Sequence, residues 1–114
     1  MAYNPNAWRK NKRENDPKYR MYSIKDKAVT RKIKFEKNPI KYELMTNLLN
    51  ENCYYCDKKK AWGLDRIDNT KGYLLDNVLP CCGGCNVSRH TQYTVQEFKV
   101  MIQALLKFRK KNKK

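Results

Sequence analysis

Apolar residues recur at helical spacing in three stretches of the chain. The first stretch predicts a basic helix over about residues 18–34, with an interrupted apolar stripe formed by Tyr22, Val29 and Ile33. The second stretch begins at Asn38 and Pro39, which suit the cap and the first position of a helix. The apolar positions of this second helix are expected to face the core: Ile40, Leu44, Met45, Leu48 and Leu49.

The third stretch predicts a helix near the end of the chain. Thr94 and Glu97 have the Thr-x-x-Glu spacing of a capping box, which marks a helix start. The inner face of this helix is expected to consist of Val95, Phe98, Ile102, Leu105 and Phe108. The strongly basic tail "KFRKKNKK" is expected to be disordered.

Between these helices the pattern changes to short extended segments. "AWGLDRI" predicts one strand and "LLDNVLP" a second, with the polar loop "DNTKGY" between them. "CCGGCNVSRH" then predicts a glycine-bearing turn that leads into a short helix. Two strands and several helices in 114 residues predict a single α+β domain.

Charge points to a polyanionic partner. The formal net charge is +15, from 26 Lys and Arg against 11 Asp and Glu. The excess is clustered, because residues 1–37 carry 12 basic and four acidic side chains. A solvated surface rarely needs so one-sided an excess, so nucleic acid is the expected partner.

The chain has no apolar run near the length of a membrane span, and its start lacks the apolar segment of a secretion signal. An intracellular protein is therefore expected, in which thiols stay reduced and spaced cysteines indicate a metal site. Cys53 and Cys56 form one Cys-x-x-Cys turn, and Cys82 and Cys85 form another. Four thiolates suit a structural zinc ion, which would compensate for a small core.

Two alternatives concern these cysteines. Cys81 would replace Cys82 as a ligand only with a less usual three-residue spacer, so Cys81 is interpreted as a small buried side chain. The four cysteines of the two turns could also be buried thiols without a metal. A closed four-thiolate zinc has no open position for substrate, so such an ion would hold the fold and do no chemistry.

From Cys53 to His90 the sequence resembles the HNH endonucleases, the His-Me finger or ββα-metal class. The likeness rests on "LDRID", "LDNVLP" and "CCGGCN", which occur in this order with the thiol pairs around them. It is similar to a zinc-containing "DRIDN" subgroup known from phages and large DNA viruses. The resemblance implies a small zinc-stapled, treble-clef-like ββα-metal unit with flanking helices.

The resemblance also implies residue roles for the hydrolysis of DNA phosphodiester bonds. Asp65 and Asn86 would ligate a catalytic divalent ion, Mg²⁺ or Mn²⁺, separate from the structural zinc. Asn77 would hold the loop between the strands by hydrogen bonds to backbone. Asp68 would either join the ion or brace this loop. Taken singly, these residues also fit ordinary turn and surface chemistry.

Arg66 stands where most of the family has its general-base histidine. An arginine stays protonated and cannot take a proton from water. Three accounts remain: Arg66 stabilises charge on the phosphate and no strong base is needed, His90 or Asp68 acts as base, or the site is inactive. The alternative to an endonuclease is therefore a catalytically inactive, zinc-held protein that binds or regulates nucleic acid.

The resemblance and the charge pattern together predict four segments. They are a flexible basic arm (1–17), a basic helical region (18–52), the HNH domain with its C-terminal helix (53–108) and a basic tail (109–114). Phosphate contacts are expected to give affinity with little sequence reading, so specific targeting would need a partner protein. The expected DNA contacts are Arg9, Lys10, Lys12, Arg13, Arg31, Lys32, Lys34 and Arg89.

Overall fold

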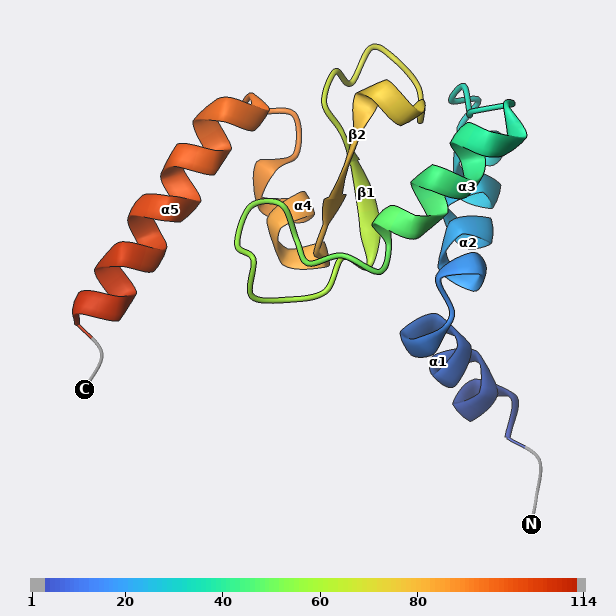
Figure 1. The fold of residues 1–114 in the computed structure, drawn as a ribbon, viewed down its shortest axis with the longest axis horizontal. Coiled ribbons are helices and arrows are strands. Elements are labelled where there is room, and N and C mark those ends of the chain that lie inside the picture. Colours follow the sequence, from blue (N-terminus) through green and yellow to red (C-terminus); the bar gives the residue numbers. More distant parts are fainter. Residues whose placement is uncertain (1–3, 113–114) are drawn as a thin grey trace.

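The computed structural model describes residues 4–112 of the chain (Figure 1). Within that range there are five α-helices and one antiparallel pair of strands, which confirms the α+β prediction. The elements are α1 (Pro5–Asn15), α2 (Pro17–Thr30), α3 (Pro39–Leu48), β1 (Gly63–Arg66), a 3₁₀ turn (Leu75–Asn77), β2 (Val78–Cys81), α4 (Gly83–Arg89) and α5 (Val95–Lys111).

The strands form a hairpin at the centre of the molecule. Gly63 pairs with Cys81 and Arg66 with Val78, so the loop of residues 67–77 joins the strands at the Arg66 end. Helices α1 to α3 lie on one side of the hairpin, and α4 and α5 lie on the other (Figure 1). The hairpin is therefore held between a helical region and the cysteine turns.

Two buried clusters hold these parts together. The first joins α2, α3 and the hairpin and consists of Met21, Ala28, Phe35, Met45, Leu49, Leu64 and Val78. The second joins the cysteine turns to the start of α5 and consists of Cys53, Tyr55, Cys81, Cys82, Cys85 and Phe98. A core divided in this way is small on each side, so additional cross-links have large effects on stability.

The first segment differs from the predicted flexible arm, because residues 5–15 form helix α1. The Asn4 side chain accepts hydrogen bonds from the backbone N–H groups of Asn6 and Ala7, and Pro5 occupies the first turn. Asp16 and Pro17 begin α2 in the same way. Both helix starts use short-range capping chemistry. The part of the predicted arm over residues 1–3 lies outside the described residues.

Helix α2 ends at Thr30, four residues before the predicted end. The backbone N–H of Lys32 donates to the carbonyl of Val29, and that of Ile33 donates to the carbonyl of Ala28. This is the Schellman pattern, and its left-handed position is filled by Lys32, with φ of 59°. The chain then runs as an extended connector, residues 32–38, into α3.

The predicted apolar stripe of the first long helix is wrong at Tyr22 and Val29, whereas Ile33 packs against the core from beyond the end of α2. The side chains of Tyr22 and Val29 are 67% and 63% exposed, whereas Met21 and Ala28 are buried. The buried face is thus offset by one residue, because α2 packs through its small and flexible side chains against α3 and the hairpin. The capping residues predicted for α3 and α5, Asn38 and the Thr94–Glu97 box, are confirmed.

Helices α3 and α5 are less buried than their stripes predict. In α3, Met45 and Leu49 are buried, but Ile40 and Leu44 are exposed. In α5, Phe98 is buried, whereas Leu105 and Phe108 are exposed because the helix extends away from the hairpin (Figure 1). The predicted disorder of the tail is also wrong as far as Lys111, where α5 ends, and residues 113–114 lie outside the described range. None of the described helices is long and apolar enough to cross a membrane.

Candidate metal centre and hairpin site

Four cysteine side chains converge beside the hairpin. Cys53 and Cys56 come from the turn before β1, and Cys82 and Cys85 come from the turn that begins α4. Their sulfur atoms all lie within 4.8 Å of one another, and the Sγ atoms of Cys56 and Cys82 are 3.9 Å apart. The structure therefore brings the two predicted thiol pairs together in a Cys₄ cluster.

The donor set and spacing of this cluster fit zinc. A zinc–sulfur bond of about 2.3 Å places the thiolates of a tetrahedron roughly 3.8 Å apart. Burial raises the pKa of Cys53, but hydrogen bonds from the backbone of Cys82, Cys56 and Tyr55 lower it to about 7. Burial raises the pKa of Cys82 and Cys85, and a cation bound by the cluster would favour the thiolate form of both.

Cys81 stands apart from the cluster. Its side chain is fully buried, and its Sγ donates to the carbonyl of Cys82 at 3.3 Å. Burial raises the pKa of this thiol, and the nearby Cys53 and Asp65 raise it further. Cys81 is therefore a buried thiol of strand β2, as expected from its spacing.

Asp65 on strand β1 lies in a buried polar network. Its Oδ2 accepts a hydrogen bond of 2.5 Å from the hydroxyl of Tyr55, and its Oδ1 accepts one of 2.6 Å from Arg89. The Asp65 side chain is only 4% exposed. Burial and the contact with Asp65 raise the pKa of Tyr55, which keeps the hydroxyl as a donor. Sequence patterns gave no signal for Tyr55, because it sits inside a cysteine turn.

Arg89 has a different place from the predicted DNA contact. Its side chain is 2% exposed and lies between α4 and β1. Besides Asp65, its guanidinium donates to the carbonyls of Arg66 and Ile67, at 3.0 and 3.1 Å. Its Nε has no partner among the described residues. Arg89 therefore joins the end of the short α4 helix to strand β1 and to the start of the hairpin loop.

Asn77 and Asp68 organise the loop between the strands. The amide group of Asn77 donates to the carbonyls of Asp68 and Gly72 and accepts from the backbone N–H of Asp68. This matches the expected bonding of Asn77 to backbone. The Oδ1 of Asp68 accepts from both the backbone N–H and the hydroxyl of Thr70, and these bonds lower the pKa of Asp68. Asp68 thus braces the loop.

Arg66 lies over this loop at the end of strand β1. Its Nη1 donates to the carbonyls of Asn69 and Lys71, both at 3.0 Å, and its guanidinium lies 5.4 Å from the centre of the Tyr73 ring. The side chain remains partly exposed. Arg66 therefore has guanidinium hydrogens left for a ligand at the surface.

The side chains of Asn86, on α4, and of His90, which follows α4, are both exposed. The Asn86 side chain is exposed one turn before Arg89, so the two share one face of the helix. His90 follows the helix with φ of 45°, and its Nδ1 lies 3.1 Å from the hydroxyl of Thr91. Apart from the Cys₄ cluster, no group of three or more His, Cys, Asp and Glu side chains converges in the described part of the chain.

The other predicted DNA contacts lie on the side of the N-terminal helices. Lys12 is partly exposed beside Asp16, at 3.8 Å, and the remaining ones are exposed. They come from α1, from the end of α2 and from the connector: Arg9, Lys10, Lys12, Arg13, Arg31, Lys32 and Lys34. Apart from Arg89, the structure leaves these predicted cations accessible to a polyanion.

Comparisons with known proteins give one sequence relative and one structural relative of note. No protein-family model matches the chain. It is 35% identical, over 94 residues and 80% of its length, to an uncharacterized protein of Acanthamoeba polyphaga mimivirus, and it spans 17% of that protein. Its structure matches that of the rare-cutting HNH restriction endonuclease PacI with a TM-score of 0.67 and 16% identity, over 82% of this chain and 78% of that chain. The chain thus has an HNH-like fold with a Cys₄ cluster beside the hairpin.

Proposed function

We propose that the protein is an HNH-type endonuclease that hydrolyses phosphodiester bonds of DNA with the help of a divalent ion. The observation that carries the proposal is the similarity in fold to the HNH restriction endonuclease PacI over 82% of the chain. The formal net charge of +15 supports DNA as the substrate, because a basic surface attracts the phosphate backbone.

Asp65 and Asn86 are the residues that would hold the divalent ion. Carboxylate and amide oxygens are the donors that Mg²⁺ and Mn²⁺ prefer, and such an ion stabilises negative charge on a phosphate. Each carboxylate oxygen of Asp65 already accepts one hydrogen bond, but each has a second lone pair. The 4% exposure of Asp65 means that access to it requires some opening between β1 and α4.

The side chains differ in their suitability as a base. Arg66 stays protonated, and the lowered pKa of Asp68 makes this carboxylate a weak base. His90, the chain's one histidine, is exposed next to Thr91. We assign to Arg66 the role of stabilising charge on the phosphate, since its remaining hydrogens face the surface. The zinc would hold the cysteine turns and take no part in hydrolysis.

A second candidate function is binding of nucleic acid without hydrolysis. The buried pair of Asp65 and Arg89 favours it, because this pair already satisfies the carboxylate that the ion would need. Both candidates require zinc and DNA binding. Only the endonuclease requires a second ion at Asp65 and Asn86.

Nicking of supercoiled plasmid separates the two candidates. Asn86→Ala removes an exposed amide that makes no side-chain hydrogen bond to the described residues, so it should leave the fold intact. Asn47→Ala, at an exposed position of α3, is the matched control. With Mg²⁺ or Mn²⁺, we expect nicking by the wild type and by the control, and none by Asn86→Ala, while bound zinc stays equal. Wild-type protein that binds DNA but nicks with neither ion would establish the second candidate.

A further inference from the structure

A hollow of about 530 Å³ lies between the connector that follows α2 and the loop of the hairpin. The connector contributes Lys32 and Lys34, the loop contributes Lys71, and strand β1 contributes Arg66. No carboxylate lines the hollow. Four cationic side chains from three segments therefore meet at one surface depression.

Backbone bonds fix the two walls of this hollow. The N–H of Tyr73 donates to the carbonyl of Lys34, and the N–H of Glu36 donates to the carbonyl of Tyr73, each at 2.9 Å. A Cβ added to Gly72 would lie 2.1 Å from the carbonyl oxygen of Lys34, so only glycine permits this approach. The backbone that carries the cations is thus already ordered. Less conformational entropy of the protein is therefore lost when a ligand binds.

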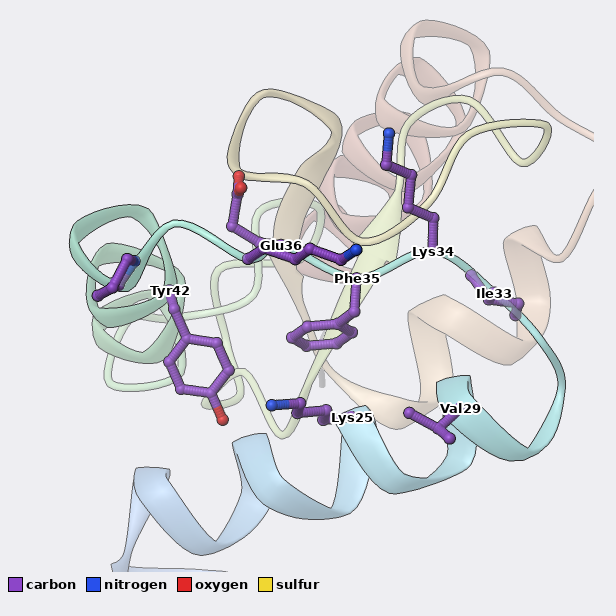
Figure 2. Close-up of a pocket in the computed structure, with 9 residues that line it drawn as sticks. Lys25, Val29, Ile33, Lys34, Phe35, Glu36 and Tyr42 are labelled. Carbon is purple, nitrogen blue, oxygen red and sulfur yellow. The ribbon is translucent and has the colours of Figure 1, made fainter.

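The extended connector sorts its side chains onto two sides. Figure 2 shows Lys34 and Glu36 projecting from one side of the connector and Phe35 from the other. Phe35 is buried in the core beside Tyr73, and a Glu36 oxygen accepts from the backbone N–H of Leu75. Lys34 is the exposed member of the three. The Glu36 carboxylate does not line the hollow, and no salt bridge joins it to Lys34.

The cations of the hollow have few internal partners. Among the described residues, no salt bridge involves Lys32, Lys34 or Lys71. The nearby carboxylate of Asp68 is turned to Thr70. Arg66 uses one nitrogen for loop carbonyls. Positive charges held together at a surface without salt bridges are the arrangement that anions stabilise.

We propose that Lys32, Lys34 and Lys71 of this hollow bind a backbone phosphate of DNA, separate from the scissile phosphate assigned to Arg66. This contact would tie the N-terminal helical region and the hairpin to one strand. It rests on the proposed function only in taking DNA as the partner. We take the phosphate to belong to a DNA duplex, because the net charge of +15 favours a polyanion. The protein is 45 Å long, a length over which one DNA strand carries about 13 phosphates at about 3.4 Å each.

Lys32 provides an unusual test of this site. It occupies the left-handed position of the Schellman motif, where glycine is the favoured residue. Lys32→Gly therefore removes a cation while relieving the backbone. We expect the melting temperature of Lys32→Gly to be equal to or higher than that of the wild type and its affinity for a 20-bp duplex to be lower. Unchanged affinity in this variant would overturn the proposal.

A triple variant gives the larger effect. We compare Lys32→Gly/Lys34→Gln/Lys71→Gln with a control that removes three exposed lysines elsewhere: Lys58→Gln, Lys59→Gln and Lys60→Gln. Fluorescence anisotropy with a labelled 20-bp duplex, without added Mg²⁺ or Mn²⁺, measures affinity across a salt series. Each DNA phosphate that is no longer neutralised lowers the slope of log affinity against log salt by about 0.9.

We expect the triple variant to lose about tenfold in affinity and about two in the salt slope, and the control to lose less than one in the slope. Equal losses in the two variants would refute the site. The result is independent of catalysis: absence of plasmid nicking together with a selective loss in the triple variant would remove the endonuclease and keep the hollow. Plasmid nicking together with equal losses in the two variants would support the endonuclease and refute the phosphate site.

Discussion

At the scale of single residues, Cys81 and Cys82 are neighbours with different surroundings. Cys82 lies in the four-sulfur cluster, whereas the Sγ of Cys81 donates to the carbonyl of Cys82. Spacing along the chain alone leaves both as candidate ligands. The turn at the start of α4 selects Cys82, because its side chain also accepts from the backbone N–H of Cys85.

This difference predicts opposite effects of two adjacent substitutions. Cys82→Ser removes a soft ligand, so we expect the purified protein to lose its bound zinc. In Cys81→Ser, the new hydroxyl can donate to the carbonyl of Cys82, which accepts from the Cys81 thiol in the native protein. Because no ligand of the cluster is changed, we expect bound zinc to stay near one per chain. Atomic absorption of purified protein measures both. If only Cys81→Ser lost its zinc, Cys81 would be the zinc ligand and Cys82 the buried thiol.

Arg89 allows a prediction about stability. Lysine keeps the charge but cannot donate at once to Asp65 and to the carbonyls of Arg66 and Ile67. We expect Arg89→Lys to lower the free energy of unfolding by about 1–3 kcal/mol, since buried acceptors lose their partners. Denaturant unfolding with zinc present measures the change. Arg31→Lys, at an exposed position, is the control, and an equal effect in both would contradict the assigned role of Arg89.

At the scale of the elements, Gly72 decides how the hairpin loop meets the connector. Its φ is not positive, so the requirement is space and not backbone conformation. An alanine Cβ would meet the backbone of Lys34 at 2.1 Å, and neither wall can move without breaking the bonds of Tyr73. We expect Gly72→Ala to lower the free energy of unfolding by about 1–3 kcal/mol or more.

Gly84→Ala is the matched control for this prediction. A Cβ at Gly84 meets no atom within 4 Å, and the residue lies in helix α4. Alanine at such a helical position stabilises by about 0.4–1 kcal/mol. Thermal unfolding of both variants in the same buffer compares the two. A destabilisation of Gly84→Ala as large as that of Gly72→Ala would show that the close approach to Lys34 is not the cause.

The elements also show what sequence reasoning can reach. Helix starts at Asn38 and Thr94 were predictable because a cap is decided by residues two or three apart. The thiol pairs were predictable because zinc imposes its own spacing. The buried faces of the helices were not predictable, because the burial of each side chain depends on partners that are distant in sequence. Helix α5 carries a full apolar stripe, yet only its first turns meet the cysteine turns.

The candidate site follows the same division. The family resemblance implied the loop-bracing role of Asn77, whose partners Asp68 and Gly72 lie in the loop that it closes. The partners of Asp65 come from a cysteine turn and from the end of α4, 10 and 24 residues away. Arg89 was therefore assigned to the surface by its charge, although the fold buries it. A charged residue alone carries no sign of the partner that folding will supply.

At the scale of the whole molecule, charge is distributed unequally around the hairpin. The acid of strand β1 is enclosed, whereas the cations of α1, the end of α2 and the connector are exposed on one side. The end of α5 carries further basic residues, but it extends away on the opposite side (Figure 1). A straight, rigid duplex cannot contact the basic residues at both ends of the molecule to the same extent, so one basic region should dominate binding.

We predict that α1 is the dominant region of these two. Helix α1 leads through α2 into the connector that lines the phosphate hollow, so both belong to the N-terminal region whose cations are exposed. Glutamine at Arg9, Lys10, Lys12 and Arg13 should lower the salt slope of duplex binding by about 0.9 for each phosphate released, with no change in melting temperature. Four substitutions at the end of α5, Lys107→Gln, Arg109→Gln, Lys110→Gln and Lys111→Gln, remove the same charge. If they reduce the slope as much, binding follows net charge alone, and the position of α1 has no part in it.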